Sequence, residues 1–132
     1  MMVPKLEAAW NGRSGASVSE AFTADGVRVE YALPGARLEG RSAIAEHTQG
    51  YVTAVPDCVL EIRSVIQGDD GSVTVEWTFR GTHSGDLPGL PARGEDVALE
   101  GVSVCRMDDE LISEERVYWD AATLLAGAGV LG

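Results

Sequence analysis

The sequence predicts an α+β fold in which helices from the N-terminal half pack on one face of a strongly curved antiparallel or mixed sheet. The first observation is the order of elements, because short helices, one strand and a further helix precede a run of strands joined by turns. The second is the stretch 73–120, which reads as three long strands with alternating apolar positions. A bent sheet capped by helices forms a cone with an open mouth, a usual place for a small-molecule site.

The first half of the chain is expected to supply three helices and one strand. The first helix has Leu6, Ala9 and Trp10 on one face, and a second short helix follows with Ser17 as its cap. Asp25-Gly26 predicts a turn. In the strand after it, over 27–33, the side chains expected on one face are Val27, Val29, Tyr31 and Leu33. The third helix begins near residue 41 or 42 and stops at Pro56, with an apolar stripe of Ile44, Thr48, Tyr51, Val52 and Val55.

The second half is expected to hold four strands and a last short helix. The strands are predicted over 59–66, 73–80, about 97–107 and about 111–120. The run Gly-Asp-Asp-Gly at 68–71 is typical of a hairpin turn between the first two of these strands. AATLLA, over 121–126, reads as the last helix, and the tail 127–132 is too rich in glycine for a firm element. Neither a repeat nor a linker interrupts the sequence, so one domain over 1–132 is expected.

Strand alternation suggests where a pocket lies. If the period of two in the 73–80 strand persists past its end, His83 shares a face with Trp77 and Phe79. In the last strand the same parity groups Ile112, Glu114, Arg116, Tyr118 and Asp120. A histidine and an aspartate are thus expected at the ends of neighbouring strands, on faces rich in aromatic residues, and we interpret them as one pocket wall.

Charge and composition exclude several classes of function. The formal net charge is −11, from 21 acidic and 10 basic residues. Nucleic-acid affinity relies on lysine and arginine at phosphates, so neither a polyanion nor an anionic membrane is an expected partner. The sequence has no apolar run near the length of a membrane span and no signal peptide, which favours a cytoplasmic location.

Cysteines and histidines are few. Cys58 and Cys105 are not in a ligand-type spacing and are expected to stay reduced. His47 and His83 have no carboxylate cluster around them in the sequence, so no metal site is expected.

Four motifs resemble the SnoaL-like polyketide cyclase family, within the nuclear transport factor 2-like superfamily. Two of them are weak alone: Ala9-Trp10-Asn11, and Leu38-Glu39-Gly40-Arg41 with Ala43-Ile44. The other two are specific: WTFRGTHSG at 77–85, and EERVYWD at 114–120 followed by Leu124-Leu125. The resemblance covers essentially the whole chain.

This resemblance implies a cone-shaped α+β barrel, usually a homodimer, which closes rings by an intramolecular aldol reaction without a metal or organic cofactor. The catalytic aspartate of the family falls on Asp120, and the histidine of the GTHxG segment falls on His83. The residues expected to bind a polyketide-like substrate are Trp10, Tyr31, Tyr51, Trp77, Phe79, Arg116 and Tyr118.

The sequence departs from the family at two places. Some cyclases of the family carry a histidine before the arginine of the penultimate strand, where this chain has Cys105 before Arg106. The turn before the last strand is usually Asp-Gly, whereas this chain has Asp109-Glu110, and glutamate takes a positive φ less readily than glycine.

Each candidate residue also has a purely structural interpretation. Asp120 precedes a predicted helix and could be only its N-cap, and Arg116 could simply pair with a nearby carboxylate. His83 could be a surface hydrogen-bonding residue, and the tryptophans and tyrosines could be core or dimer contacts. The segment 81–96, with four glycines and two prolines, is either a plain hairpin loop or a lid over the cone mouth.

The chemistry expected of such a pocket is proton transfer. Desolvation raises the pKa of a carboxylate, which then abstracts a proton next to a carbonyl more effectively. We expect Asp120 to be this base, with His83, Tyr31 or Tyr118 as donor to the developing enolate.

The leading hypothesis is a cofactor-free cyclase or isomerase of polyketide-type secondary metabolism. The alternatives are a non-catalytic small-molecule binding module of the same fold, or an enzyme like a ketosteroid isomerase, dehydratase or epoxide hydrolase. A homodimer is expected through the convex face of the sheet. The apolar residues expected on that face are Val102, Val104, Val117 and Trp119.

Overall fold

The computed structural model describes residues 2–32, 35–87 and 90–127. One curved, mixed sheet has the strand order β2-β1-β6-β5-β4-β3. Its strands are β1 (Phe22–Glu30), β2 (Ala36–Glu39), β3 (Val59–Gln67), β4 (Ser72–His83), β5 (Glu95–Asp108) and β6 (Leu111–Trp119). The helices are α1 (Leu6–Asn11), α2 (Gly15–Ser19), α3 (Arg41–Ala54) and α4 (Ala121–Gly127). The predicted α+β class, with a strongly curved sheet and helices, is confirmed.

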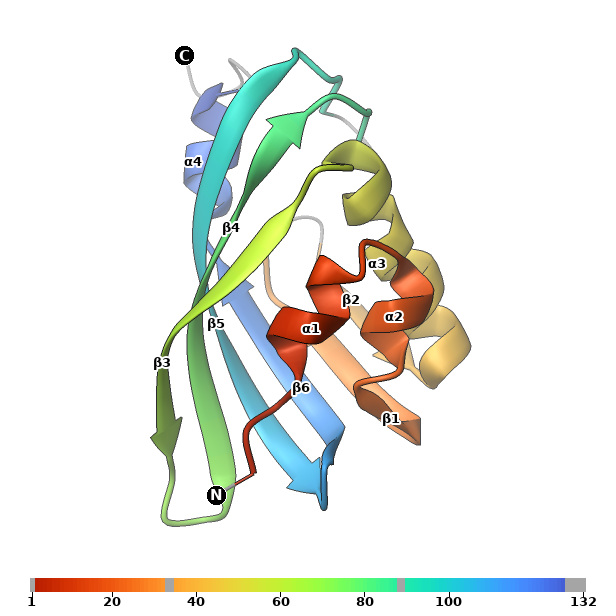
Figure 1. Cartoon of the computed structure of the whole chain (residues 1–132), viewed down its shortest axis with the longest axis vertical. Coiled ribbons are helices and arrows are strands. Elements are labelled where there is room, and N and C mark those ends of the chain that lie inside the picture. Colours follow the sequence, from red (N-terminus) through yellow and green to blue (C-terminus); the bar gives the residue numbers. More distant parts are fainter. Residues whose placement is uncertain (1, 33–34, 88–89, 128–132) are drawn as a thin grey trace.

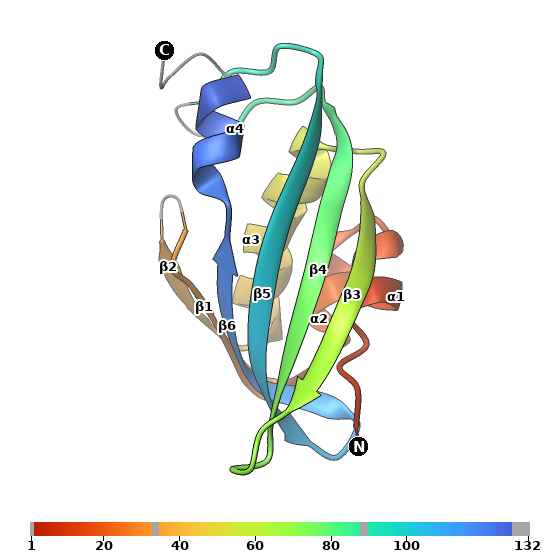
Figure 2. The same cartoon turned by 90° about the vertical axis from the view of Figure 1, so that its left-hand side faces the viewer.

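The helices lie where they can close the concave side of the sheet. Figure 1 shows α1, α2 and α3 together on one side of the long, bent strands β3 to β6, and Figure 2 shows α4 at the end of the sheet where β5 begins. All neighbouring strands pair antiparallel except β1 and β6, which are parallel. The parallel pairing joins the N-terminal strand to the C-terminal one. Within the described residues, no helix is long and apolar enough to cross a membrane.

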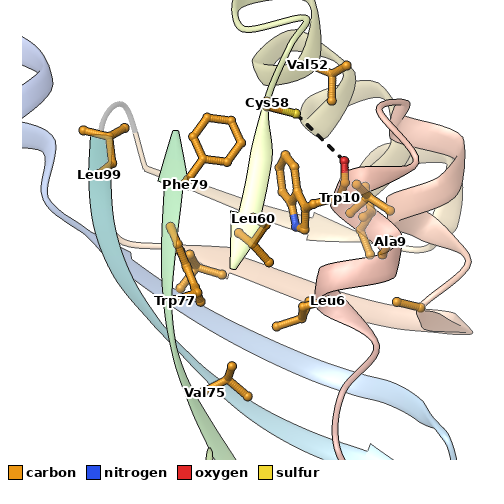
Figure 3. Close-up of a cluster of buried hydrophobic side chains, with 14 of the residues drawn as sticks. Leu6, Ala9, Trp10, Val52, Cys58, Leu60, Val75, Trp77, Phe79 and Leu99 are labelled. Carbon is orange, nitrogen blue, oxygen red and sulfur yellow. Dashed lines mark hydrogen bonds between the residues drawn. The ribbon is translucent and has the colours of Figure 1, made fainter. Parts of the chain in front are cut away.

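The core fills the space between α1, α3 and the concave face of the sheet. Figure 3 shows Leu6 and Trp10 of α1 facing Leu60 of β3 and Trp77 and Phe79 of β4. The rings of Trp10 and Phe79 meet edge to face, with centroids 5.8 Å apart, a favourable geometry for aromatic pairs. On α3 the buried residues are Ile44, Thr48, Val52 and Ala54, so the predicted helix and most of its apolar stripe are confirmed.

The first strand differs from its prediction in three ways. It begins at Phe22, and Asp25-Gly26 lies inside it as a register shift in its pairing with β6. The expected face is inverted, because Arg28 and Glu30 are buried while Val27 and Val29 are only partly covered. Residue 33, expected on the same face, lies outside the described residues. A short strand, β2, which the sequence did not predict, pairs with β1.

The last strand carries a β-bulge that the alternation pattern did not predict. Ile112 pairs with Met107, but Glu114 pairs with Arg106, so Ser113 is the extra residue on β6. After the bulge, the inward and outward positions of β6 are shifted by one residue. Glu115 and Val117 therefore face inward, whereas Tyr118 and Asp120 are exposed, and the face predicted for Ile112 to Asp120 is wrong beyond Ile112.

Two local predictions concern caps and turns. The cap of α2 is Ser14, whose side chain accepts a hydrogen bond from the backbone of Ser17, and not Ser17 itself. In the turn between β5 and β6, Asp109 takes the left-handed conformation, with φ of 57°. Aspartate tolerates that region better than most residues, so the Asp-Glu sequence still makes the tight turn.

Candidate functional site

An apolar cavity of about 60 Å³ lies between α1, α3 and the concave face of the sheet. Aromatic side chains dominate its wall, namely Trp10, Tyr51, Trp77, Phe79 and Trp119. The polar side chains on the wall are Arg28, His83, Ser103 and Glu115. Ser103 Oγ accepts a hydrogen bond from Trp77 Nε1 at 2.9 Å. The charged or basic groups on the wall are a guanidinium, a carboxylate and an imidazole.

The guanidinium and the carboxylate form a buried ion pair. Arg28 of β1 and Glu115 of β6 are partners across the parallel pairing, and Arg28 Nη1 lies 2.7 Å from Glu115 Oε1. Glu30, two residues along β1, faces the same way, with Oε2 3.4 Å from Arg28 Nη2. Burial by itself lowers the pKa of Arg28, but Glu115 and Glu30 outweigh it and raise that pKa above its usual value.

Side chains other than Arg28 also hold the carboxylate of Glu30 in place. The hydroxyl of Tyr51 and Nε1 of Trp119, at 3.3 Å, both donate to Glu30 Oε1. His47 of α3 approaches with Nδ1 3.9 Å from Glu30 Oε2, beyond hydrogen-bond range. Burial lowers the pKa of His47 despite Glu30, so this imidazole is neutral at pH 7. Burial, helped by Glu30, raises the pKa of Tyr51, which keeps its hydroxyl protonated.

His83 lies at the last position of β4 and is only 4% exposed. Its Nε2 has no hydrogen-bond partner among the residues that the structure describes. Gly81 makes this position possible, because a Cβ there would lie 2.4 Å from Val55 Cγ1. Thr82 anchors the strand end by donating through its backbone and its hydroxyl to Asp57. The glycine and threonine of the GTHxG segment thus hold the histidine in the cavity wall.

Trp77 forms the floor of the cavity by lying over a glycine. It pairs across β4 and β5 with Gly101, where a Cβ would come within 2.3 Å of the indole ring. Only a residue without a side chain leaves room for the ring and for its hydrogen bond to Ser103. Trp10, Tyr51, Trp77, Phe79 and His83, which the sequence placed in the pocket, all line the cavity.

Asp120 is not brought to the cavity. It is exposed at the N-terminus of α4, where its carboxylate accepts hydrogen bonds from the backbone and the hydroxyl of Thr123. These contacts hold its pKa below the usual value. The backbone N–H of Asp120 donates to the carbonyl of Glu100 on β5, whereas His83 pairs with Glu95 of the same strand. Five residues of β5, roughly 16 Å, therefore separate Asp120 from His83 along the sheet. The expectation that Asp120 and His83 converge is wrong, because the bulge in β6 turns position 120 outward and its side chain caps α4.

Three further candidates also lie outside the cavity. Tyr31 and Tyr118 stack on the outer face with centroids 4.7 Å apart, and they are 57% and 42% exposed. Arg116 is half-exposed, 3.8 Å from Glu114. Of the predicted convex patch, Val102 and Val104 are partly exposed, but Val117 is buried and Trp119 lines the cavity.

The sequence pattern did not identify Arg28, Glu30 and Glu115 as site residues. A charged pair at i and i+2 in a strand normally reads as a solvated face, and Glu115 was assigned to the outside by unbroken alternation. One available signal was the stretch 27–31 itself, in which Arg28 and Glu30 sit between strand-forming residues and need oppositely charged partners if buried. In the described part of the chain, this site included, no three histidine, cysteine or acidic residues gather as metal ligands would.

Comparison with known proteins gives the following matches. The profile of the SnoaL-like polyketide cyclase family matches residues 1–127. Among solved structures, AclR from Streptomyces galilaeus, named as a candidate hydroxylase, is 23% identical with a TM-score of 0.79, over 97% of this chain and 82% of that one. IdmH from Streptomyces antibioticus, a candidate polyketide cyclase, is 25% identical with a TM-score of 0.71, over 95% and 94%.

A third structure is a hypothetical protein with a ketosteroid isomerase-like fold from Catenulispora acidiphila, in complex with trimethylamine. It is 23% identical with a TM-score of 0.78, over 98% of this chain and 95% of that one. No curated protein matches the chain.

Proposed function

This chain belongs to the SnoaL-like polyketide cyclase family, and from that premise we propose that it is a cofactor-independent cyclase or isomerase. The proposed substrate is a bulky, mostly apolar, oxygenated intermediate of polyketide-type secondary metabolism. The observation that carries the proposal is the ion pair of Glu115 and Arg28 on the wall of a largely apolar, aromatic cavity. In this proposal Glu115, and not Asp120, is the general base.

The proposed reaction begins with proton transfer to Glu115. A carboxylate in a water-poor pocket can take a proton from a carbon next to a carbonyl, which leaves an enolate. In a cyclase, the enolate carbon forms a bond to a second carbonyl carbon of the same molecule, and that carbonyl oxygen receives the proton. In an isomerase, the proton returns to a different carbon. Neither route oxidises or reduces the substrate.

His83 and the aromatic wall have separate proposed roles. His83 Nε2 is available to exchange a proton with a substrate oxygen toward the end of the cavity near α4. The aromatic side chains hold a flexible chain folded, and such proximity can supply a large part of a rate enhancement. The hydroxyl of Tyr51 donates to Glu30, so its role is to hold that carboxylate in place.

Substrate entry requires part of the cavity wall to move. A cavity of about 60 Å³ is much smaller than a typical small-molecule site of roughly 300–1,000 Å³. Leu87, in the segment after β4, and Leu124 of α4 both contribute to the wall. We therefore propose that the segment 84–87 after His83, together with α4, moves to admit the substrate.

The test is hydrogen–deuterium exchange at the carbon next to the carbonyl of α-tetralone and its three-ring homologue in heavy water, followed by mass spectrometry. The protein is expected to accelerate this exchange. Glu115→Gln removes the base with little change in shape, so the rate should fall about 10²–10⁴-fold. Asp120→Asn is the matched control, because it makes the same chemical change outside the cavity and should leave the rate unchanged.

Two results would count against the proposal. Exchange at the wild-type rate in Glu115→Gln would remove the proposed base. Tight binding of the ketones with no exchange by the wild-type protein would favour the alternative of a small-molecule binding module.

A further inference from the structure

Arg28 carries a buried hydrogen-bond donor without a partner. Its two terminal nitrogens bond Glu115 and Glu30, but its Nε–H has no acceptor among the described residues, although the side chain is only 4% exposed. A guanidinium cannot lose its proton in a protein, so Nε is always a donor. Buried donors without an acceptor are rare in folded proteins, and each one calls for an explanation.

The position of Arg28 offers such an explanation. Its guanidinium lies over the ring of Trp10, 5.6 Å from the ring centroid, and both side chains line the cavity together with Glu115. We propose that the Nε–H of Arg28 binds the carbonyl oxygen of the substrate and stabilises the enolate that forms when Glu115 takes the proton. The inference rests on the proposed function and deepens it, because it assigns the oxygen-binding group and limits the class of substrate.

The two carboxylates have different roles in this arrangement. Glu115 lines the cavity and can exchange a proton with a ligand. Glu30 does not line it, and its carboxylate accepts hydrogen bonds from Arg28, Tyr51 and Trp119. Glu30 is thus a positioning residue that holds the guanidinium through Nη2, so that Nε keeps a fixed direction while Glu115 changes its charge.

The summed charge of Glu30, Glu115 and Arg28 determines whether a ligand binds as a neutral molecule or as an anion. With both carboxylates ionised, Glu30, Glu115 and Arg28 together carry one negative charge, and His47 beside them is neutral. A ligand that enters as an anion adds a second negative charge in a buried place, which is costly. A neutral ligand that gives its proton to Glu115 leaves the total unchanged and places its new negative charge against Arg28. The substrate class is therefore a neutral, enolisable carbonyl compound and not a carboxylate or a phosphate.

The experiment uses para-nitrophenol as an enolate mimic, because its phenolate is coloured and its neutral form is not. Nitrogen–proton NMR spectra of the wild-type protein contain side-chain Nε–H signals from nine arginines, and the eight others are internal controls. At a pH below the pKa of the free phenol, we expect the Arg28 signal alone to move downfield on titration. We also expect the bound phenol to show phenolate absorption, which Glu115→Gln abolishes.

Specificity is tested with para-nitrobenzoate, which has the same ring and nitro group but enters as an anion. It should bind at least about tenfold more weakly than the phenol, since like charges placed together are costly. Arg28→Lys keeps the charge, removes Nε and serves to assign the signal. If that variant does not fold, triple-resonance assignment of the wild-type protein gives the same information.

An unchanged Arg28 signal in the presence of the phenol, or benzoate binding as tight as phenol binding, would overturn the inference. The outcomes for the two proposals are distinct. Ketone exchange that depends on Glu115 without a response from Arg28 would remove only the oxygen-binding role. A response from Arg28 without any ketone exchange would remove only the proposed reaction.

Discussion

Gly101→Ala tests whether the cavity floor depends on the missing side chain of one residue. The added methyl group would lie 2.3 Å from the indole of Trp77, whereas ordinary contacts of a Cβ begin near 3.4 Å. The ring must therefore move by about 1 Å. That movement stretches or breaks the 2.9 Å hydrogen bond from Trp77 Nε1 to Ser103, in a part of the core that the aromatic wall already fills.

The expected cost combines overpacking with the weakened hydrogen bond. Overpacking a well-packed core costs about 1–3 kcal/mol, and a buried donor left without its partner costs about 1–3 kcal/mol. Replacing glycine by alanine in a strand returns about 0.5–1 kcal/mol through the unfolded state. We expect a net loss of about 2–3 kcal/mol, which for a domain of this length lowers Tm by roughly 10 °C.

The assay is thermal and urea unfolding followed by tryptophan fluorescence, with Gly50→Ala as the matched control. Gly50 lies within α3, and a Cβ there would meet nothing within 4 Å. The same chemical change should therefore stabilise the protein, by about 0.5–1 kcal/mol. If the two variants shift Tm in the same direction and to the same extent, the close approach of Trp77 to Gly101 does not limit the site.

Four further predictions concern acid stability, access, metals and assembly. Contacts with Ser72 and Arg106 lower the pKa of Asp70 to about 2. This carboxylate therefore stabilises the fold at pH values above its unfolded-state pKa, and the stabilisation is lost as pH falls toward 2. Asp70→Asn should reduce the fall of Tm with decreasing pH in the acid range. Hydrogen exchange in 84–87 and 90–94, between β4 and β5, should be fast without ligand and slow with it, whereas equal protection would make that segment a plain connection. Ketone exchange should persist in EDTA, and its loss on chelation would contradict the cofactor-free proposal. Light scattering should show a dimer that Tyr118→Glu converts to monomer, because the exposed Tyr31 and Tyr118 pair belongs to the outer face.

Much of the fold could be predicted because its signals are local. The apolar stripe of α3, the hairpin at 68–71 and the alternation in β4 all reflect neighbours along the chain, and each element lies close to its expected position. The same reasoning brought Trp77, Phe79 and His83 to one face, which the cavity wall confirms. These residues follow one uninterrupted strand, where a period of two is enough.

The charged part of the site could not be predicted by the same reasoning. One extra residue at Ser113 reverses every later position of β6, and a bulge leaves no reliable trace in a single sequence. Burial of Arg28 depends on Glu115, 87 residues away, so neither residue alone indicates an inward orientation. Asp120 is the opposite case, because a family motif favoured a pocket position where local chemistry indicated a helix cap, and the structure shows the cap.

The parallel pairing of β1 with β6 also has a consequence for folding kinetics. Strands β3 to β6 follow one another and can pair through short connections, but β1 must close a loop that spans most of the chain before it meets β6. Contacts of such long sequence separation form slowly, because chain entropy is lost before the contact is gained. We therefore expect Arg28 and Glu115 to meet in the last step of folding, so that a chain with its central sheet already formed still lacks the ion pair.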